Sequence, residues 1–254
     1  MLRAVTLDYW DTIYLGASMP VRVQRRREAL SRMLERLGAR VPDDFETLYI
    51  ASAQEANRWW RDEQRGYTSA ERIHWLLARM SISRPADCAE VALAVREVDR
   101  TLTDYPPALL PGVRAALERL SSRFTLAIVS DTGFASGAAQ DRLLEQDDIR
   151  HYFAATIYSM DVGHAKPRPE PFQAALASLG VAAGEALHVG DIERTDIAGA
   201  LGVGMRAVRL DAVRDSGPSA AELIAKSLEQ VAEYTLSSSE NYESMSAARY
   251  SETT

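Results

Sequence analysis

An aspartate directly follows the first apolar segment of this chain, at a position where a carboxylate can take part in catalysis. Residues 2–7 predict a short buried strand, and Asp8 comes next. In an open α/β sheet, ligands bind just beyond the carboxyl ends of the strands, and a carboxylate there can act as a nucleophile or a metal ligand. Aspartate is also common in loops and helix caps, so Asp8 alone leaves both interpretations open.

Three further apolar segments, each predicted as a strand, also end in charged or hydroxyl-bearing side chains. These segments and the residues after them are 124–129 with Ser130 and Asp131, 153–158 with Lys166, and 186–189 with Asp191 and Asp196. Strands and helices alternate in this part of the chain, which favours a parallel sheet. A parallel sheet gathers the ends of its strands at one edge, so these side chains are expected to meet there.

This order of an aspartate, a hydroxyl group, a lysine and an acidic pair resembles the haloacid dehalogenase superfamily of phosphotransferases and hydrolases. The resemblance covers roughly residues 2–14 and 105–210. It implies an α/β fold with a Rossmann-like parallel sheet as its core and an inserted all-helical cap domain. It also implies that Asp8 is the nucleophile, which attacks phosphorus to form an aspartyl-phosphate.

The same resemblance gives roles to the residues after the other strands. Thr12, Ser130 and Asp131 are the expected phosphate- and substrate-binding residues. Lys166 is the expected catalytic cation, which stabilises the charge on the nucleophile and the phosphoryl group. The chain has only two lysines among its 29 basic residues, which makes Lys166 conspicuous. The alternatives are local capping by the hydroxyl groups and a solvated surface lysine.

A Mg²⁺ site is expected from the carboxylates at two of these strand ends. Asp8 and Asp191 are the expected direct ligands, together with the backbone carbonyl of Trp10, and Asp196 is expected to act through water or to hold the other ligands. Mg²⁺ prefers oxygen ligands in octahedral geometry and keeps several waters, so two or three carboxylates suffice. The alternative for Asp191 and Asp196 is a loop followed by a helix N-cap.

Trp10 is the main departure from the superfamily pattern. Phosphatases of the superfamily usually carry a second aspartate there, which protonates the leaving oxygen and later activates water, a role worth about 10²–10⁴-fold in rate. Indole cannot do this, and Asp11 is expected to point elsewhere. The dehalogenases also lack this acid but do not use a Mg²⁺ pair. The phosphonate-cleaving branch needs a cap lysine and is excluded, because no lysine precedes Lys166.

The chain is expected to divide into a core, an inserted cap and a tail. The core is assigned to residues 1–17 and 106–236, and the cap to residues 18–105. Apolar periodicity and cap residues predict four helices in the cap, over about 22–37, 43–64, 68–80 and 85–102, and a closing helix over 219–234. The tail at 237–254 is rich in Ser, Glu, Tyr and Thr, which predicts disorder.

The composition bounds the class of protein and its partners. The chain is 46% hydrophobic with a net charge of −7 and one cysteine, which predicts a globular protein without an intrachain disulfide and without a nucleic-acid surface. No apolar run approaches about 18 residues, so no membrane span is expected. The first residues already form a strand, so no signal peptide and a cytoplasmic location are expected. A small phosphorylated molecule is the expected partner, and the cap could support oligomers.

One principal functional hypothesis and two alternatives remain open at this point. The principal hypothesis is a Mg²⁺-dependent phosphatase of a small phosphorylated metabolite, acting through an aspartyl-phosphate on Asp8. The first alternative is an L-2-haloacid dehalogenase-type hydrolase that uses Asp8 without a metal. The second is a non-catalytic phosphate-binding or regulatory protein that keeps the fold with Trp10 in place of the acid. Cap tryptophans (Trp59, Trp60 and Trp75) and nearby arginines are candidates for a substrate pocket.

Overall fold

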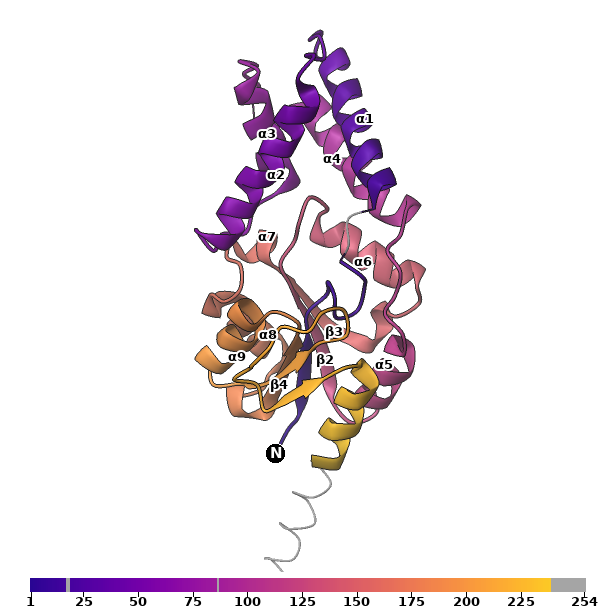
Figure 1. The fold of residues 1–254 in the computed structure, drawn as a ribbon, viewed down its shortest axis with the longest axis vertical. Helices are drawn as coiled ribbons and strands as arrows, with labels where there is room; N and C mark the ends of the chain where they lie inside the picture. The colour runs from indigo at the N-terminus through magenta and orange to yellow at the C-terminus, as the bar shows by residue number, and fades with distance from the viewer. Residues whose placement is uncertain (17–18, 86, 239–254) are drawn as a thin grey trace, which may run out of the picture.

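A six-stranded parallel sheet forms the centre of the molecule, in the strand order β3-β2-β1-β4-β5-β6 (Figure 1). The structure is a computed structural model that describes residues 1–16, 19–85 and 87–238. The strands are β1 (Ala4–Leu7), β2 (Thr125–Ser130), β3 (Phe153–Tyr158), β4 (Ala186–Gly190), β5 (Arg206–Leu210) and β6 (Leu223–Ala225). The predicted α/β class with a parallel sheet is confirmed.

The first strand lies at the middle of the sheet, which explains why its sequence is apolar throughout. All four residues of β1 are buried, as expected for a parallel strand covered on both faces. Leu7 is in register with Ile128 of β2 and with Val189 of β4. The three strands therefore end at nearly the same level, and the residues after them face the same edge of the sheet.

Helices cover both faces of this sheet. On one face, α8 (Pro169–Leu179) and α9 (Ala198–Gly202) pack Phe172 and Ala200 against apolar side chains of the strands. On the other face lie α5 (Val113–Ser121), α6 (Gly137–Gln146) and a closing helix over residues 228–238. The short helical segments are α7 (Ser159–Val162), two 3-10 turns at Arg150–Tyr152 and Ala183–Glu185, and a π-helical turn at Glu193–Ile197.

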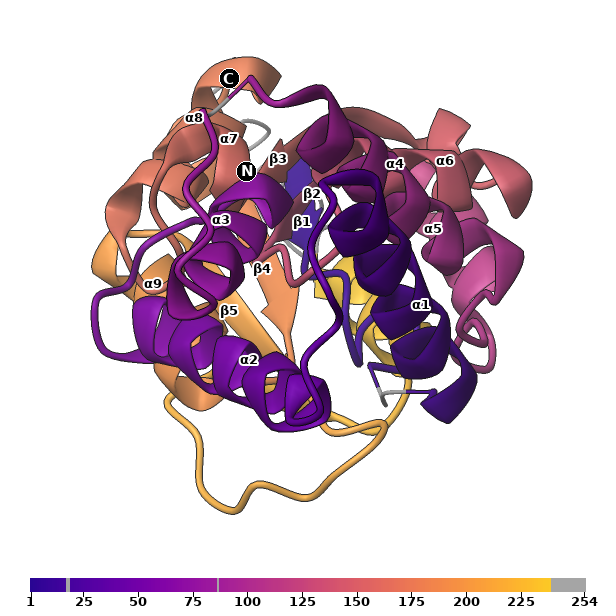
Figure 2. The same cartoon turned by 90° about the horizontal axis from the view of Figure 1, so that it is seen from above.

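Four helices form a separate layer beyond the carboxyl ends of the strands, as Figures 1 and 2 show. They are α1 (Pro20–Arg36), α2 (Phe45–Arg61), α3 (Ser69–Arg79) and α4 (Ala89–Asp104). Their facing apolar residues, among them Leu30, Ile73 and Val98, form a core of their own. Thr68 and Glu71 form a capping box that fixes the start of α3. The expectation of four helices after the first strand therefore matches the structure.

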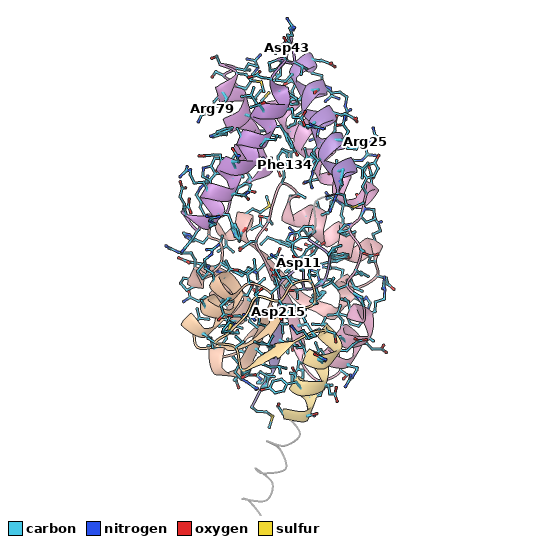
Figure 3. The ribbon with its side chains drawn as sticks, viewed as in Figure 1. Asp11, Arg25, Asp43, Arg79, Phe134 and Asp215 are labelled. Carbon is cyan, nitrogen blue, oxygen red and sulfur yellow. The ribbon has the colours of Figure 1, made fainter. Side chains whose placement is uncertain are left out.

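One residue of the sheet layer enters this second core. Phe134 follows β2 on a loop that rises between the helices, and Figure 3 shows it at the base of the helical layer. Its side chain is buried among the apolar residues of the four helices. The loop that follows Ser130 and Asp131 is thus held by the helical layer.

The predicted closing helix over 219–234 is wrong in its first half. Residues 223–225 form β6 instead, with Leu223 in register with Val208 of β5, and the helix begins only at residue 228. The backbone N–H and C=O groups at the edge of β5 need hydrogen-bond partners, which a neighbouring strand supplies and a helix does not. The predicted tail begins at residue 237, but residues 239–254 lie outside the described part of the chain. None of the described helices is long and apolar enough to span a membrane.

Candidate active site

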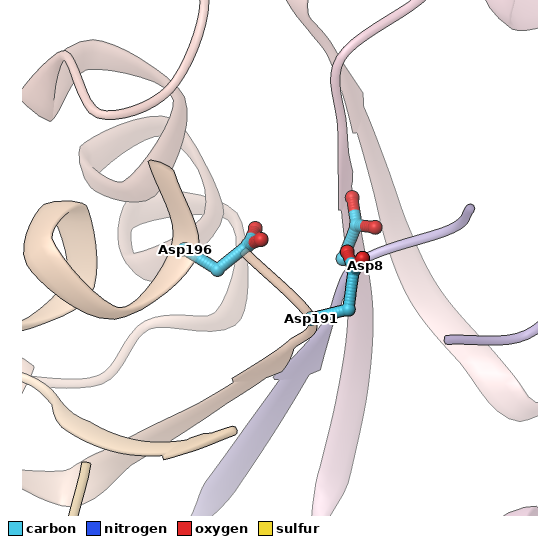
Figure 4. A group of neighbouring side chains, drawn as sticks. All are labelled: Asp8, Asp191 and Asp196. Atoms are coloured by element: carbon cyan, nitrogen blue, oxygen red, sulfur yellow. The ribbon is translucent and has the colours of Figure 1, made fainter. Parts of the chain in front are cut away.

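Three buried carboxylates converge beyond the ends of β1 and β4 (Figure 4). Asp8 directly follows β1, Asp191 directly follows β4, and Asp196 lies in the π-helical turn after it. One oxygen of each carboxylate lies within 4.8 Å of the others. A Cβ at Gly190 would lie only 2.4 Å from Asp196 Cγ, so the glycine allows this close approach.

Lys166 lies inside this group of carboxylates. Its ammonium Nζ donates to Asp8 Oδ1 at 2.5 Å, to Asp196 Oδ1 at 2.6 Å and to the carbonyl of Val129 at 2.9 Å. The side chain is only 2% exposed. A lysine is almost never buried to this extent without charged partners, so the alternative of a solvated surface lysine does not hold.

The lysine and its carboxylate partners shift one another's protonation equilibria. Burial alone would lower the pKa of Lys166, but Asp196 and Asp8 raise it above its usual value. Burial would raise the pKa of Asp196, but Lys166 and the side chain of His188 lower it. The ammonium and the Asp196 carboxylate therefore form a fixed ion pair beside Asp8.

The pKa values of Asp8 and Asp191 are raised by burial, because neighbouring cations offset burial less for these two carboxylates than for Asp196. Burial raises the pKa of Asp8 despite the opposing effect of Lys166. Burial and the charge of Asp196 raise the pKa of Asp191 to about 7. Asp191 Oδ2 is buried and accepts no hydrogen bond from the described residues.

This donor set suits a divalent cation. Three carboxylates lie together here, and two of them, Asp8 and Asp196, pair with the ammonium of Lys166. Asp191 Oδ2 accepts no hydrogen bond from the described residues and lies 3.3 Å from the half-exposed guanidinium of Arg214. A buried carboxylate is costly unless a cation lies beside it. Oxygen ligands of this kind are those that Mg²⁺ prefers. The residues present therefore fit the expected metal.

The carboxylates open into a cavity of about 360 Å³ between the sheet and the helical layer. Its lining includes residues of both layers: Asp8, Trp10, Asp11, Gly16, Asn57, Trp60, Tyr67, Asp131, Thr132, Gly133, Lys166, Asp191, Ile192, Thr195, Asp196 and Arg214. Six of the eight site residues expected from the sequence thus share one cavity. The other two, Thr12 and Ser130, are not among its lining residues.

Asp131 links the two layers across this cavity. Its Oδ2 accepts a hydrogen bond from Trp60 Nε1 of α2 at 2.8 Å, and its Oδ1 accepts from the backbone N–H of Lys166 at 3.0 Å. Arg194 lies over the Trp60 ring, 5.1 Å from its centroid. Of the three cap tryptophans considered above, Trp60 lines the cavity, whereas Trp59 and Trp75 do not.

The two hydroxyl groups expected to bind phosphate are both buried. Thr12 Oγ1 is buried and has no hydrogen-bond partner among the described residues, so it can donate to a ligand oxygen. Ser130 Oγ donates to Gln140 Oε1 at 2.9 Å. Ser130 must release Gln140 before it can donate to a phosphate.

Asp11 is held by its own backbone loop and by Arg214. Its φ of 55° is in the left-handed region, and its Oδ1 accepts a hydrogen bond from the backbone N–H of Gly16 at 2.7 Å. Its Oδ2 forms an ion pair with Arg214. Asp11 lines the cavity, with its two carboxylate oxygens engaged by Gly16 and Arg214.

Arg214, Asn57 and Tyr67 are cavity residues that the sequence analysis missed. Arg214 lies on the loop after β5, and its guanidinium is 3.3 Å from Asp191 Oδ2. Asn57 and Tyr67 come from α2 and from the connection to α3. Arg214 lies several residues beyond the end of β5, Asn57 and Tyr67 follow no strand, and none of the three belongs to a motif, so no signal in the sequence pointed to them.

The family model for haloacid dehalogenase-like hydrolases matches residues 2–204 of this chain. The chain belongs to this family. The protein is therefore a hydrolase of the haloacid dehalogenase type.

Two relatives that cover most of this chain are named as phosphatases. The glyceraldehyde 3-phosphate phosphatase of Methanopyrus kandleri is 29% identical over 83% of this chain and 84% of its own length. The enzyme of the same name from Pyrococcus abyssi is 31% identical over 82% of this chain and 81% of its own.

Solved structures from both branches of the family share the fold. A haloacid dehalogenase-type phosphatase from Thermococcus onnurineus has a TM-score of 0.64 at 22% identity, covering 92% of this chain and 98% of its own. A 2-haloacid dehalogenase from Pseudomonas syringae has a TM-score of 0.66 at 26% identity, covering 92% and 97%. Overall similarity thus does not separate the two activities, and the site must do so.

Proposed function

We propose that this hydrolase is a Mg²⁺-dependent phosphatase of a small phosphorylated metabolite, acting through an aspartyl-phosphate on Asp8. The observation that carries the proposal is the convergence of Asp8, Asp191 and Asp196 within 4.8 Å of one another. A hydrolase that uses only a nucleophile and a lysine has no need of two further buried carboxylates, because each of them disfavours the ionised form of Asp8.

In this proposal, Asp8, Asp191 and the backbone carbonyl of Trp10 hold Mg²⁺, and Asp196 supports the set. The metal, when bound, supplies positive charge that offsets the carboxylates and the phosphate group. Asp191 contributes the oxygen that has no other hydrogen-bond partner. Asp196 accepts from Lys166 and from the backbone N–H of Ile192 at 3.0 Å, which fixes its orientation.

Asp8 supplies the nucleophilic oxygen. It attacks phosphorus, the bond from phosphorus to the ester oxygen breaks, and that oxygen leaves with the electron pair. Lys166, 2.5 Å from Asp8 Oδ1, favours the ionised nucleophile against the effect of burial and stabilises charge in the transition state. Thr12 and Ser130 donate hydrogen bonds to the phosphoryl oxygens. Water then attacks phosphorus, which releases phosphate and restores Asp8.

The cavity favours a small substrate. Its volume of about 360 Å³ is at the lower end for ligand pockets. Asp131, bonded to Trp60 of the helical layer, holds the two layers together over the substrate. The glyceraldehyde 3-phosphate phosphatases among the relatives act on a molecule of this size class.

Trp10 supports one alternative, hydrolysis of a carbon–halogen bond. A halide leaves without protonation, so an enzyme of this type needs no acid at the position of Trp10. The similarity to a 2-haloacid dehalogenase at 26% identity points the same way. Asp191, whose buried Oδ2 accepts no hydrogen bond from the described residues, argues against this alternative, because that chemistry gives it no role.

A substrate panel with and without Mg²⁺ separates the two activities. Phosphate release from small phosphate monoesters is measured in Mg²⁺ and in excess chelator, and chloride release from L-2-chloropropionate is measured under both conditions. We expect phosphate release that the chelator abolishes and no chloride release. Chloride release that persists in chelator, without phosphate release, would show that the protein is a dehalogenase.

A further inference from the structure

A second cavity lies beside the catalytic one and is lined by two arginines. Its volume is about 220 Å³. Arg22 and Arg26 line it, together with the loop residues that surround Phe134. Trp10, Gly16 and Gly133 line both cavities, so a molecule bound at Asp8 needs only a short extension to reach the second cavity.

The two arginines lie four residues apart on α1 and therefore share one face of the helix. Arg22 is 5% exposed, and burial and the like charge of Arg26 lower its pKa. Burial also lowers the pKa of Arg26. No aspartate or glutamate is among the described residues that line this cavity. The cavity is thus strongly positive, whereas the catalytic cavity is strongly negative.

Neighbouring groups hold the arginine side chains in place. Arg26 Nε donates to Thr101 Oγ1 of α4 at 3.0 Å, and its guanidinium lies 5.9 Å from the centre of the Phe134 ring. The negative charge of Asp99 partly offsets the effect of burial and raises the pKa of Arg26. The carboxylate of Asp99 already accepts hydrogen bonds from the backbone and side chain of Ser136 at 2.8 and 2.6 Å.

We propose that Arg22 and Arg26 form an anion-binding subsite, and that the substrate is a small phosphate monoester with a second anionic group, a carboxylate or another phosphate. The proposal rests on the phosphatase function above and names its substrate class. Arginine suits this role because its planar fork of donors matches the oxygens of either anion. Phosphate esters whose other end is neutral would place no anion in this positively charged cavity.

Matched substrates test this class directly. The first pair is 3-phosphoglycerate and glycerol 3-phosphate, which differ in a carboxylate and a hydroxymethyl group. The second pair is the bisphosphate and the monophosphate of propane-1,3-diol. The wild-type protein is expected to have a kcat/KM at least about tenfold higher for the anionic member of a pair, which is the effect of one charge-assisted hydrogen bond. The pair that shows this preference identifies the second anion.

Substitutions in α1 assign the preference to residues. Arg22→Gln and Arg26→Gln should each reduce kcat/KM at least about tenfold for the anionic member, with less than about twofold change for the neutral one. Arg25→Gln is the matched control, because Arg25 lies on the outer side of the same helix, as Figure 3 shows, and pairs with Glu28. Arg26→Lys keeps the charge and should retain part of the preference, even if the glutamine variants fold poorly.

The outcomes separate this proposal from the phosphatase function. Equal kcat/KM for both members of each pair, or equal loss in the arginine variants, would overturn the subsite while the phosphatase function stands. If the wild-type protein hydrolyses none of the four esters, binding is measured by calorimetry instead. Selective binding of an anionic member that Arg26→Gln abolishes would still support the subsite, and its absence would overturn it.

Discussion

Asp191 is a carboxylate whose ionised form is unfavourable until a cation joins it. Burial and Asp196 raise its pKa to about 7, and its Oδ2 has no hydrogen-bond partner. Asp191→Asn is therefore expected to raise the melting temperature of the metal-free protein by about 2–4 °C, the effect of ~1 kcal/mol in a domain of this size. The same change should abolish stabilisation by Mg²⁺. Thermal unfolding with and without Mg²⁺ measures both effects.

The control for this experiment is Asp43→Asn, because Asp43 is exposed in the helical layer. It should change neither quantity. An Asp191→Asn protein that Mg²⁺ stabilises as much as wild type would show that Asp191 is not a metal ligand.

Arg214 competes with a metal for the same carboxylate. Its guanidinium lies 3.3 Å from Asp191 Oδ2 and pairs with Asp11, while half of its side chain is exposed. Removing it takes away a rival cation and makes the site more negative. Arg214→Gln should therefore tighten Mg²⁺ binding by about two- to fivefold, in line with the modest worth of an exposed ion pair. Calorimetric titration measures this, and weaker Mg²⁺ binding would contradict the competition.

Trp10 cannot protonate a leaving group, which predicts how rate depends on the leaving group. A poor leaving group must depart unprotonated, and each factor of ten in rate is about 1.4 kcal/mol of barrier. The rate over a series of aryl and alkyl phosphates should fall steeply as leaving-group pKa rises. Trp10→Asp should flatten that slope.

Asp11→Asn serves as the comparison in this series. The ion pair with Arg214 and the hydrogen bond from Gly16 occupy both oxygens of the Asp11 carboxylate, so the loss of Asp11 should leave the slope unchanged. Equal rates for aryl and alkyl esters in the wild type, combined with a steep slope in Asp11→Asn, would identify Asp11 as the acid that replaces the missing aspartate.

At the scale of single residues, the cavity residues that directly follow strands could be predicted from the sequence. Asp8, Lys166 and Asp191 could be predicted because a parallel sheet brings strand ends together whatever the loops do. Arg22 and Arg214 could not, because their positions depend on how a helix and a long loop pack over the cavity. Local sequence patterns, such as helix periodicity or turn residues, do not determine how these segments pack against the rest of the molecule.

At the scale of elements, α2 is the helix that closes the catalytic cavity. Trp60 of α2 donates to Asp131 at 2.8 Å, and this bond joins the helical layer to the loop after β2. Trp60→Phe keeps the ring and removes the donor. It should raise KM by about two- to tenfold, the worth of one hydrogen bond, with a smaller effect on kcat. Steady-state kinetics on one substrate measures the split.

Trp75→Phe is the matched control, because Trp75 also belongs to the helical layer but does not line the cavity. It should leave both constants near wild type. A Trp60→Phe protein with unchanged KM would show that this bond does not hold the closed arrangement.

The elements themselves could be predicted where local signals were strong. Thr68 caps α3 at the start predicted for the helix over 68–80, and Pro169 and Gly180 bound α8. β6 was missed because three residues, only two of them strongly apolar, carry too little periodicity. Its formation depends on the exposed edge of β5, which is a property of the assembled sheet and not of the segment.

At the scale of the whole molecule, two hydrophobic cores meet around one cavity. The sheet and its helices form one unit and the four helices another, with Phe134 of the first buried in the second. The limits proposed for the two units, 18–105 for the cap and 1–17 with 106–236 for the core, place the interface at this cavity. A substrate bound at Asp8 therefore contacts both units, and specificity can change in the cap while the carboxylates stay fixed.

The central claim, that Asp8 forms an acyl phosphate, can be tested by trapping the intermediate. The enzyme is mixed with Mg²⁺ and a phosphate ester that it hydrolyses, and is then reduced with borohydride, which converts an aspartyl-phosphate to homoserine. Tandem mass spectrometry of the peptide that contains Asp8 and Asp11 locates the change. We expect homoserine at position 8 only during turnover, and none in Asp8→Asn. Homoserine at position 11, or unmodified Asp8 under conditions that trap the intermediate in a known aspartyl-phosphate enzyme, would contradict the account.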